Sequence, residues 1–375
     1  MKWTGMYSLW TFLIYSSINV LFILKYGLRI APLSTAVVAC GLYVAIMAAI
    51  LWGLNARIKR PSKNIIYPLI GITIAGLVIL QLHFDPYALR VDRWSAIHNF
   101  LQNLLNGEYP YAAKTHLGGY GSPFPIWQIL HLPFYLLGNV GLSFVFFLLL
   151  FTDAIRRTVS YRAAITAFLL LILSPAFIYE VSVRSDLISN FLLCAAILMC
   201  LHHYKVTLER NWVLIAVVCG LMMSTRLSIA IPFIVYYFYD YLRCHQAKIQ
   251  ILFPCLAILV FALTFLPFML WNGQMLFFFE YNPFILQTRQ GLYIDYILIM
   301  VICITASVWM KNRWHYYMLI SASCLLALVV ITFTSNMYIY DRWDELFCSR
   351  FDITYFNMAL PFTIAAIACK EETKA

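Results

Sequence analysis

The sequence is poor in charge: only 11% of its 375 residues are Asp, Glu, Lys or Arg, whereas 63% are hydrophobic. A water-soluble domain of this length carries about a quarter charged residues and roughly half apolar ones. The scarcity of charge therefore excludes a soluble globular enzyme and indicates a membrane protein.

Several motifs that carry chemistry are missing as well. No P-loop, HExxH or GxSxG motif occurs, which argues against ATPase, metalloprotease and serine hydrolase functions. The ten cysteines include no CxxC pair, and neither they nor the eight histidines have a metal-ligand spacing. The formal net charge of +10 comes without a long basic run, so nucleic acid is not an expected partner.

What the sequence does contain is a series of long apolar runs without strand-like alternation. A bilayer core about 30 Å thick needs roughly 20 apolar residues for each helical crossing. The sequence therefore predicts an all-α membrane protein, a polytopic helical bundle of about twelve (roughly 10–13) transmembrane helices in a single domain over residues 1–375. The runs lie at 6–24, 33–54, 65–84, 124–151, 163–180, 187–202, 211–224, 228–241, 250–271, 292–310, 316–335 and 354–369.

Two of these assignments stay open. The run at 124–151 contains Pro133 and Gly138 and is either a bent helix or a hairpin. The runs at 211–224 and 228–241 are either two short helices or one helix with Arg226 in its middle.

The loop charges predict an orientation in a plasma or inner membrane. If the loop with Arg57, Lys59, Arg60 and Lys63 is cytoplasmic, more than half of the 26 Lys and Arg share that side, and both termini are cytoplasmic. Most of the 16 Asp and Glu then fall on the extracytoplasmic side. We expect the chemistry to face outward, although acids also avoid the anionic cytoplasmic leaflet for simple electrostatic reasons.

The long loop at 85–123 is predicted to carry an amphipathic helix over 93–106. Asp92 is placed to cap its start and Gly107 to end it, and such a helix would lie flat among the lipid headgroups. Its apolar face is predicted from Trp94, Ile97, Leu101, Leu104 and Leu105, and its polar positions from Ser95, Asn99, Gln102 and Asn103.

Two carboxylates of this loop, Asp85 and Asp92, stand beside Arg90 and Arg93. In a functional interpretation, one carboxylate is a general base for an attacking hydroxyl, and the arginines hold a phosphate. The alternative is that Asp92 only caps the helix and Asp85 is an ordinary loop residue with surface ion pairs.

An aromatic and glycine-rich segment follows the helix. Glu108, Tyr109 and Tyr111 precede the sequence GGYGSPFP, which includes Tyr120. Such a segment suits a wall that stacks on a sugar ring, and it equally suits an interfacial belt of aromatic residues.

Other charges fall in later turns. Glu180, Arg184 and Asp186 lie in a short outer turn, and Arg226 lies near hydrocarbon, where it needs either a carboxylate or a phosphate partner. The C-terminal extracytoplasmic loop at 336–353 has charges of both signs and includes Arg350.

The segment VDRWSAIHNFLQNLLNGEYPYAAKTHLGGYGSPFPIWQILHLPFYLLG resembles the integral-membrane glycosyltransferases of the C superfold, which are mannosyltransferase-like enzymes that use polyprenyl-phosphate sugars. The resemblance extends to SPAFIYEVSVRSD and STRLSIAIPF, and so covers roughly residues 85–240. It implies inverting transfer from a polyprenyl-phosphate donor to a glycan, lipid or protein acceptor on the extracytoplasmic face.

The resemblance assigns the general base to Asp92 first and Asp85 second, and the donor phosphate to Arg184, Arg226 and Arg350. Arg93, Glu108, Tyr109, Tyr111, Tyr120 and Asp186 are the expected substrate contacts. Because the acidic pair is more widely spaced than in many members, participation of a divalent cation such as Mg or Mn stays open. The alternative functions are a flippase or exporter of lipid-linked saccharides and, ranked below it, a polymerase or ligase.

Overall fold

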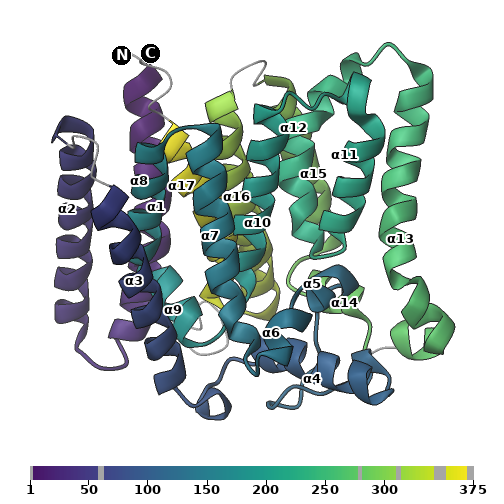
Figure 1. The fold of residues 1–375 in the computed structure, drawn as a ribbon, viewed down its shortest axis with the longest axis horizontal. Helices are drawn as coiled ribbons and strands as arrows, with labels where there is room; N and C mark the ends of the chain where they lie inside the picture. Colours follow the sequence, from purple (N-terminus) through teal and green to yellow (C-terminus); the bar gives the residue numbers. More distant parts are fainter. Residues whose placement is uncertain (1–2, 58–62, 278–280, 310–313, 342–351, 370–375) are drawn as a thin grey trace.

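The computed structural model describes residues 3–57, 63–277, 281–309, 314–341 and 352–369, which form seventeen α-helices and no extended β-strand (Figure 1). This confirms the all-α prediction. The helices are α1 (Trp3–Gly27), α2 (Leu33–Arg57), α3 (Lys63–His83), α4 (Arg93–Asn106), α5 (Pro125–Leu130), α6 (Leu132–Leu136), α7 (Ser143–Thr158), α8 (Tyr161–Ile172), α9 (Pro175–Ser182), α10 (Leu187–His203), α11 (Leu208–Met223), α12 (Ala230–Arg243), α13 (Ala247–Phe277), α14 (Pro283–Thr288), α15 (Tyr293–Trp309), α16 (Trp314–Tyr340) and α17 (Leu360–Cys369).

Among the described residues, four helices are long and apolar enough to cross a membrane, as expected for an integral membrane protein. A fifth span results if the bent pair α8 and α9 counts as one. Several other predicted runs form shorter or interrupted helices, so the number of about twelve crossings stays a prediction. The four helices contain the windows Gly5–Gly27, Leu33–Gly53, Ala247–Phe277 and Tyr316–Tyr340.

Proline and glycine explain where the apolar runs break. The run at 124–151 becomes α5, α6, a 3-10 turn (η3, Val140–Leu142) and α7, and Gly138 between them takes a φ of 85°, which a residue with a Cβ rarely adopts. Helices α8 and α9 meet at a 66° bend in front of Pro175. Asn19 of α1 stabilises the bend, because its Oδ1 accepts hydrogen bonds from the Ser174 hydroxyl and the Ala176 amide.

The bundle has a buried centre and two peripheral helices. Helix α17 is buried on all sides against α1, α8, α10 and α16. Only 17% of the apolar window is buried in α2 and in α13, which lie at opposite edges of the bundle (Figure 1). Helix α13 approaches α11 closely at Gly220, where an added Cβ would lie 2.5 Å from the carbonyl oxygen of Ala257.

The short helices gather at one end of the bundle. Figure 1 shows α4, α5, α6 and α14 together at that end, with the start of α1 and the end of α17 at the other. The hydroxyl of Tyr7 in α1 donates a 2.8 Å hydrogen bond to the carbonyl of Ala366 in α17, which joins these two ends of the chain. The irregular parts of the fold are therefore concentrated where the sequence predicts the extracytoplasmic loops.

The predicted loop helix is confirmed as α4, over Arg93–Asn106. Gly107 ends it with a φ of 75° and donates to the carbonyls of Asn103 and Leu104. Three details of the prediction are wrong. The Asp92 side chain makes no capping hydrogen bond, Ser95 is completely buried rather than on a polar face, and Leu105 is 53% exposed.

The differences at Asp92 and Ser95 have one physical cause: the start of α4 packs against protein on more sides than a surface helix would. The Ser95 hydroxyl is buried because it pairs with the Asp92 carbonyl and with Nδ1 of His116, each within 2.9 Å. The Asp92 carboxylate instead accepts a hydrogen bond from the Thr115 hydroxyl at 2.9 Å. The 114–120 loop therefore folds back over the start of α4.

Candidate functional site

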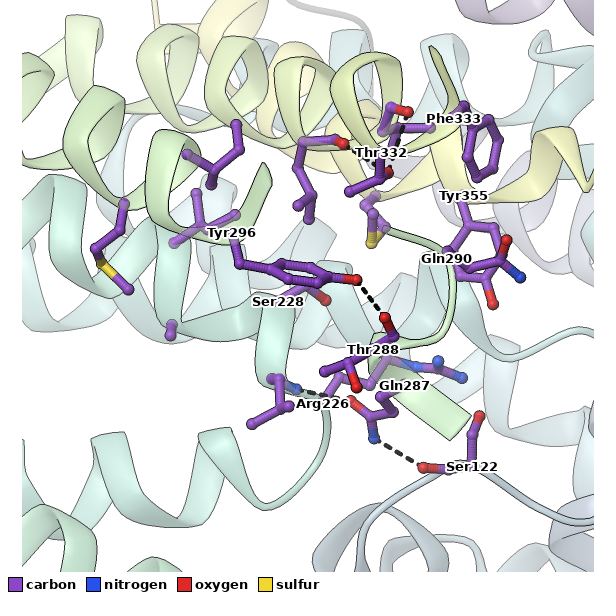
Figure 2. Close-up of a pocket in the computed structure, with 18 of the residues that line it drawn as sticks. Ser122, Arg226, Ser228, Gln287, Thr288, Gln290, Tyr296, Thr332, Phe333 and Tyr355 are labelled. Carbon is purple, nitrogen blue, oxygen red and sulfur yellow. Dashed lines mark hydrogen bonds between the residues drawn. The ribbon is translucent and has the colours of Figure 1, made fainter. Parts of the chain in front are cut away.

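A pocket of about 450 Å³ lies among α12, α14, α15 and α16 (Figure 2). Its polar end is formed by Ser122, Arg226, Gln287, Thr288, Gln290 and Tyr296. Its walls farther along are formed mainly by apolar side chains of α15 and α16, such as Ile299, Met300, Leu328 and Val329. The pocket can therefore hold an apolar chain with a polar group at one end.

Among the described residues that line the pocket, Arg226 is the one that carries charge. It lies in the break between α11 and α12, with an extended backbone (φ −156°, ψ 144°), and starts the 3-10 turn η4 (Leu227–Ile229). The structure thus selects two helices over the alternative of one helix with Arg226 in its middle. Because its backbone is extended, Arg226 does not follow the side-chain spacing of either helix.

The residues that follow the 85–123 loop (the first loop) form hydrogen bonds to the backbone in the break between α11 and α12. The amides of Phe124 and Ile126 donate to the carbonyls of Thr225 and Ser224, at 3.3 and 3.2 Å. Pro123 and Pro125 have no amide hydrogen, and the residues before prolines favour extended backbone. The SPFP segment therefore docks along the chain beside Arg226 instead of continuing a helix.

Arg226 is paired with a buried carboxylate. Its guanidinium donates to Oδ2 of Asp186 at 3.0 Å, and Nε1 of Trp127 donates to the same oxygen at 2.5 Å. Both charged side chains are nearly inaccessible, with 6% and 3% exposure. Of the two partners that the sequence allows for Arg226, the structure supplies the carboxylate.

The pair fixes the charge state of Asp186. Burial alone would raise the pKa of its carboxyl, but the guanidinium groups of Arg226 and Arg93 outweigh burial and hold the pKa below its usual range. Asp186 is therefore ionised at neutral pH, and Arg226 has a fixed anchor on its protein side.

A second ion pair lies behind the pocket wall. Arg93 of α4 donates to Oδ2 of Asp352 at 2.7 Å, and its guanidinium carbon lies 5.0 Å from the ring centre of Tyr355. Tyr355 belongs to the 3-10 turn η6 (Ile353–Ala359) and lines the pocket. Arg93 is thus separated from the pocket by a single aromatic side chain.

Three arginines in this region have a buried nitrogen without a hydrogen-bond partner among the described residues: Nε of Arg226, an Nη of Arg93 and Nε of Arg184. Arg184 has a left-handed backbone (φ 55°) and reaches the carbonyl of Gln81 at 3.5 Å, but it does not line the pocket. Sequence reasoning names all three arginines as candidates for substrate or phosphate contacts. The third phosphate candidate, Arg350, lies outside the described residues.

Neither of the two predicted bases lines the pocket. Asp92 directly precedes Arg93, and its Oδ2 would lie 3.5 Å from a Cβ added at Gly119. Asp85 is exposed and caps the 3-10 turn η1 (Pro86–Ala88) by accepting from the amide of Tyr87 at 3.0 Å. Of the two, Asp92 is the one whose chain neighbour, Arg93, contacts Tyr355 of the pocket wall.

The predicted substrate contacts of the first loop fall into two groups. Tyr109 and Tyr111 are buried, and their hydroxyls reach the carbonyls of Phe268 and Pro123, each at 3.4 Å. Glu108 is exposed after the end of α4, and Tyr120 is half-buried with its ring 4.7 Å from that of Tyr281. The tyrosine side chains join the first loop to segments late in the chain.

Sequence reasoning missed Trp127, Gln287 and Tyr355. Each acquires its role from a contact with a segment more than 50 residues away, and no local pattern marks such contacts. Trp127 also contacts His131, which is buried and whose Nδ1 lies 2.8 Å from the carbonyl of Trp127.

Within the described part of the chain, no three His, Cys, Asp or Glu side chains are grouped closely enough to hold a metal ion. The possible divalent cation stays a prediction. Comparisons with protein-family models, curated proteins and solved structures found no match to this chain.

Proposed function

We propose that this protein is an integral-membrane glycosyltransferase that transfers a sugar from a polyprenyl-phosphate donor to a glycan, lipid or protein acceptor. The observation that carries the proposal is the form of the pocket. An apolar cavity ends at a single described cation, Arg226, and at Ser122 of the first loop. This combination suits a ligand with an isoprenoid chain and a phosphate head.

The position of the pocket favours transfer over transport. Its lining residues in α15 run from Tyr293 to Met300, the first half of that helix, and those in α12 are its first two residues. A flippase needs a path for the headgroup between both leaflets, whereas a donor site needs to open only beside the first loop. Ser122 of the first loop and two residues of α14, Gln287 and Thr288, line the pocket, and α14 lies with α4 and α5 at one end of the bundle (Figure 1).

The proposed chemistry uses the two charge types of the site. The acceptor hydroxyl attacks the anomeric carbon while the bond from that carbon to the phosphate oxygen breaks, and the polyprenyl phosphate leaves with the bond electrons. Arg226 binds the phosphate of the donor and keeps this contact while the phosphate leaves. A first-loop carboxylate takes the hydroxyl proton, and Asp92 remains the first choice because it adjoins Arg93 behind the pocket wall, with Asp85 second.

The remaining assignments belong to the same proposal. Arg184 and Arg350 are further phosphate contacts, and Asp186 acts through Arg226. The chain crosses the membrane about twelve times, with both termini cytoplasmic and the pocket end extracytoplasmic. The clustering of the short helices at the end opposite the start of α1 supports this arrangement (Figure 1).

The test uses purified full-length protein in liposomes with a panel of undecaprenyl-phosphate hexoses and pentoses, beginning with the mannose derivative. We expect release of undecaprenyl phosphate together with a glycosylated product. Arg226→Lys should retain part of the activity, and Arg226→Gln should lose most of it. Arg243→Gln is the matched control, because Arg243 lies at the far end of α12 against Tyr239.

Two results would contradict the proposal. One is movement of a fluorescent lipid-linked sugar across the bilayer without cleavage of any donor, which would identify a flippase. The other is full transfer by Arg226→Gln, which would remove the pocket cation from the reaction.

A further inference from the structure

One amide side chain joins three separate segments at the polar end of the pocket. Gln287 of α14 accepts a hydrogen bond from the amide of Leu227 at 2.9 Å and donates one to the carbonyl of Ser122 at 2.7 Å (Figure 2). Leu227 follows Arg226, and Ser122 ends the glycine-rich part of the first loop. Gln287 therefore connects the first loop, the Arg226 segment and α14.

The orientation of this amide has only one solution. The Leu227 amide can only donate and the Ser122 carbonyl can only accept, so the Gln287 oxygen must face Leu227 and its nitrogen must face Ser122. Both ends of the side chain are used by backbone groups. Gln287 is thus a pocket residue with a hydrogen bond to the protein backbone at each end of its amide.

These bonds complete the support of Arg226. The carbonyls of Ser224 and Thr225 are held by the first loop, and the Leu227 amide is held by Gln287. Arg226 itself has a fixed anchor in Asp186. The backbone is therefore held on both sides of Arg226, and the side chain is held at its end.

We infer that Gln287 is a positioning residue that fixes Arg226 against the donor phosphate and couples this contact to the placement of the first loop. The inference rests on the proposed function. Because Arg226 would contact the phosphate both in the bound donor and in the transition state, loss of its positioning weakens binding in both. The effect is expected mainly in the KM for the donor and less in kcat.

The test compares the full-length wild type with Gln287→Met and Gln287→Glu. Methionine keeps the length of the side chain but makes neither hydrogen bond. Glutamate can still accept from Leu227, but its second oxygen faces the Ser122 carbonyl. We expect Gln287→Met to raise the KM for the undecaprenyl-phosphate sugar that the wild type uses by about tenfold, with kcat changed less than about threefold.

A second measurement reports the connection without activity. Hydrogen exchange in the absence of donor should become faster at residues 120–127 and 224–230 in Gln287→Met, and the other helices should keep their protection. In Gln287→Glu, exchange should increase more at residues 120–127 than at 224–230. Gln250→Ala is the matched control, because the Gln250 amide also bonds a backbone carbonyl, that of Cys244, in the loop before α13.

The outcomes separate the two proposals. If the wild type transfers sugar and Gln287→Met has an unchanged KM for the donor, the positioning role is wrong and the proposed function stands. Unchanged exchange in both segments would also overturn the positioning role. A wild type that cleaves no donor would overturn the proposed function and this role with it.

Discussion

The buried pair between Asp186 and Arg226 gives the sharpest quantitative prediction. With a charged contact of 3.0 Å and at most 6% exposure, removal of one partner leaves a buried charge without compensation. Such a loss costs about 3–5 kcal/mol. Asp186→Asn and Arg226→Gln should therefore each lower the midpoint of thermal unfolding by about 4–6 °C.

The double variant separates the pair from its surroundings. When both charges are replaced by neutral amides, no unpaired charge remains, so Asp186→Asn with Arg226→Gln should be more stable than the sum of the single losses predicts. The measurement is a thermal scan of purified protein in one detergent at one heating rate, because unfolding of membrane proteins is commonly irreversible.

The chain contains a matched control for this cycle. Asp153 and Arg156 form an ion pair at 2.6 Å, but their side chains are 40% and 42% exposed. Replacing either should change the free energy of unfolding by less than about 1 kcal/mol. Two results would refute the claim that burial makes the Asp186–Arg226 pair important for stability. One is a double variant whose loss of stability equals the sum of the two single losses, and the other is an equal loss of stability at the exposed Asp153–Arg156 pair.

Three further predictions follow from particular contacts. The pKa of Asp186 is lower in the folded than in the unfolded chain, so the contribution of its charge to stability is complete above about pH 4 and is lost as the pH falls through the folded pKa. Between pH 7 and pH 3, the thermal midpoint should therefore fall less in Asp186→Asn than in the wild type. Gly220→Ala should destabilise the packing of α11 on α13 by about 1–3 kcal/mol, since its Cβ would meet the Ala257 carbonyl, and an unchanged midpoint would show that the helices separate freely. Thr115→Val should cost about 0.5–1.5 kcal/mol and remove the hydrogen bond to the Asp92 carboxylate. The control is Thr73→Val, because the Thr73 hydroxyl bonds to the carbonyl of Leu69 within α3. A transfer rate that changes in Thr115→Val and not in the control would support a role for Asp92 in the reaction, and equal rates in both would argue against it.

Local signals predicted local structure well. Helix α4 lies where the sequence indicates because the spacing of its apolar residues and the glycine at its end, Gly107, are local features, although Asp92 does not cap its start with its side chain. The ambiguity at Arg226 could not be resolved in this way. The break there depends on hydrogen bonds from residues 122–126 and on Gln287, which are about 60 to 100 residues distant.

Hydropathy alone also could not separate lipid-facing helices from buried ones. The run at 354–369 is as apolar as a membrane span, yet it forms η6 and the ten-residue α17, which is buried by four other helices. Helix α2 has similar composition and is mostly exposed. Both environments are apolar, so composition reports only that a segment avoids water.

The charges at the pocket end have an implication beyond stability. Arg93, Glu180, Asp186, Arg226 and Asp352 come from segments that are distant in sequence, and they approach one another inside an otherwise apolar bundle. Apolar residues of similar volume would serve stability as well as such pairs do. Each carboxylate accepts hydrogen bonds from protein groups. Arg93 and Arg226 each keep one buried donor without a described partner, and Asp186 keeps one buried oxygen without one. Among the described residues that line the apolar cavity, Arg226 is the one that carries charge. A positive charge at the polar end of the cavity favours an anionic headgroup over a neutral or cationic one, which is the physical basis for proposing a lipid phosphate at this site.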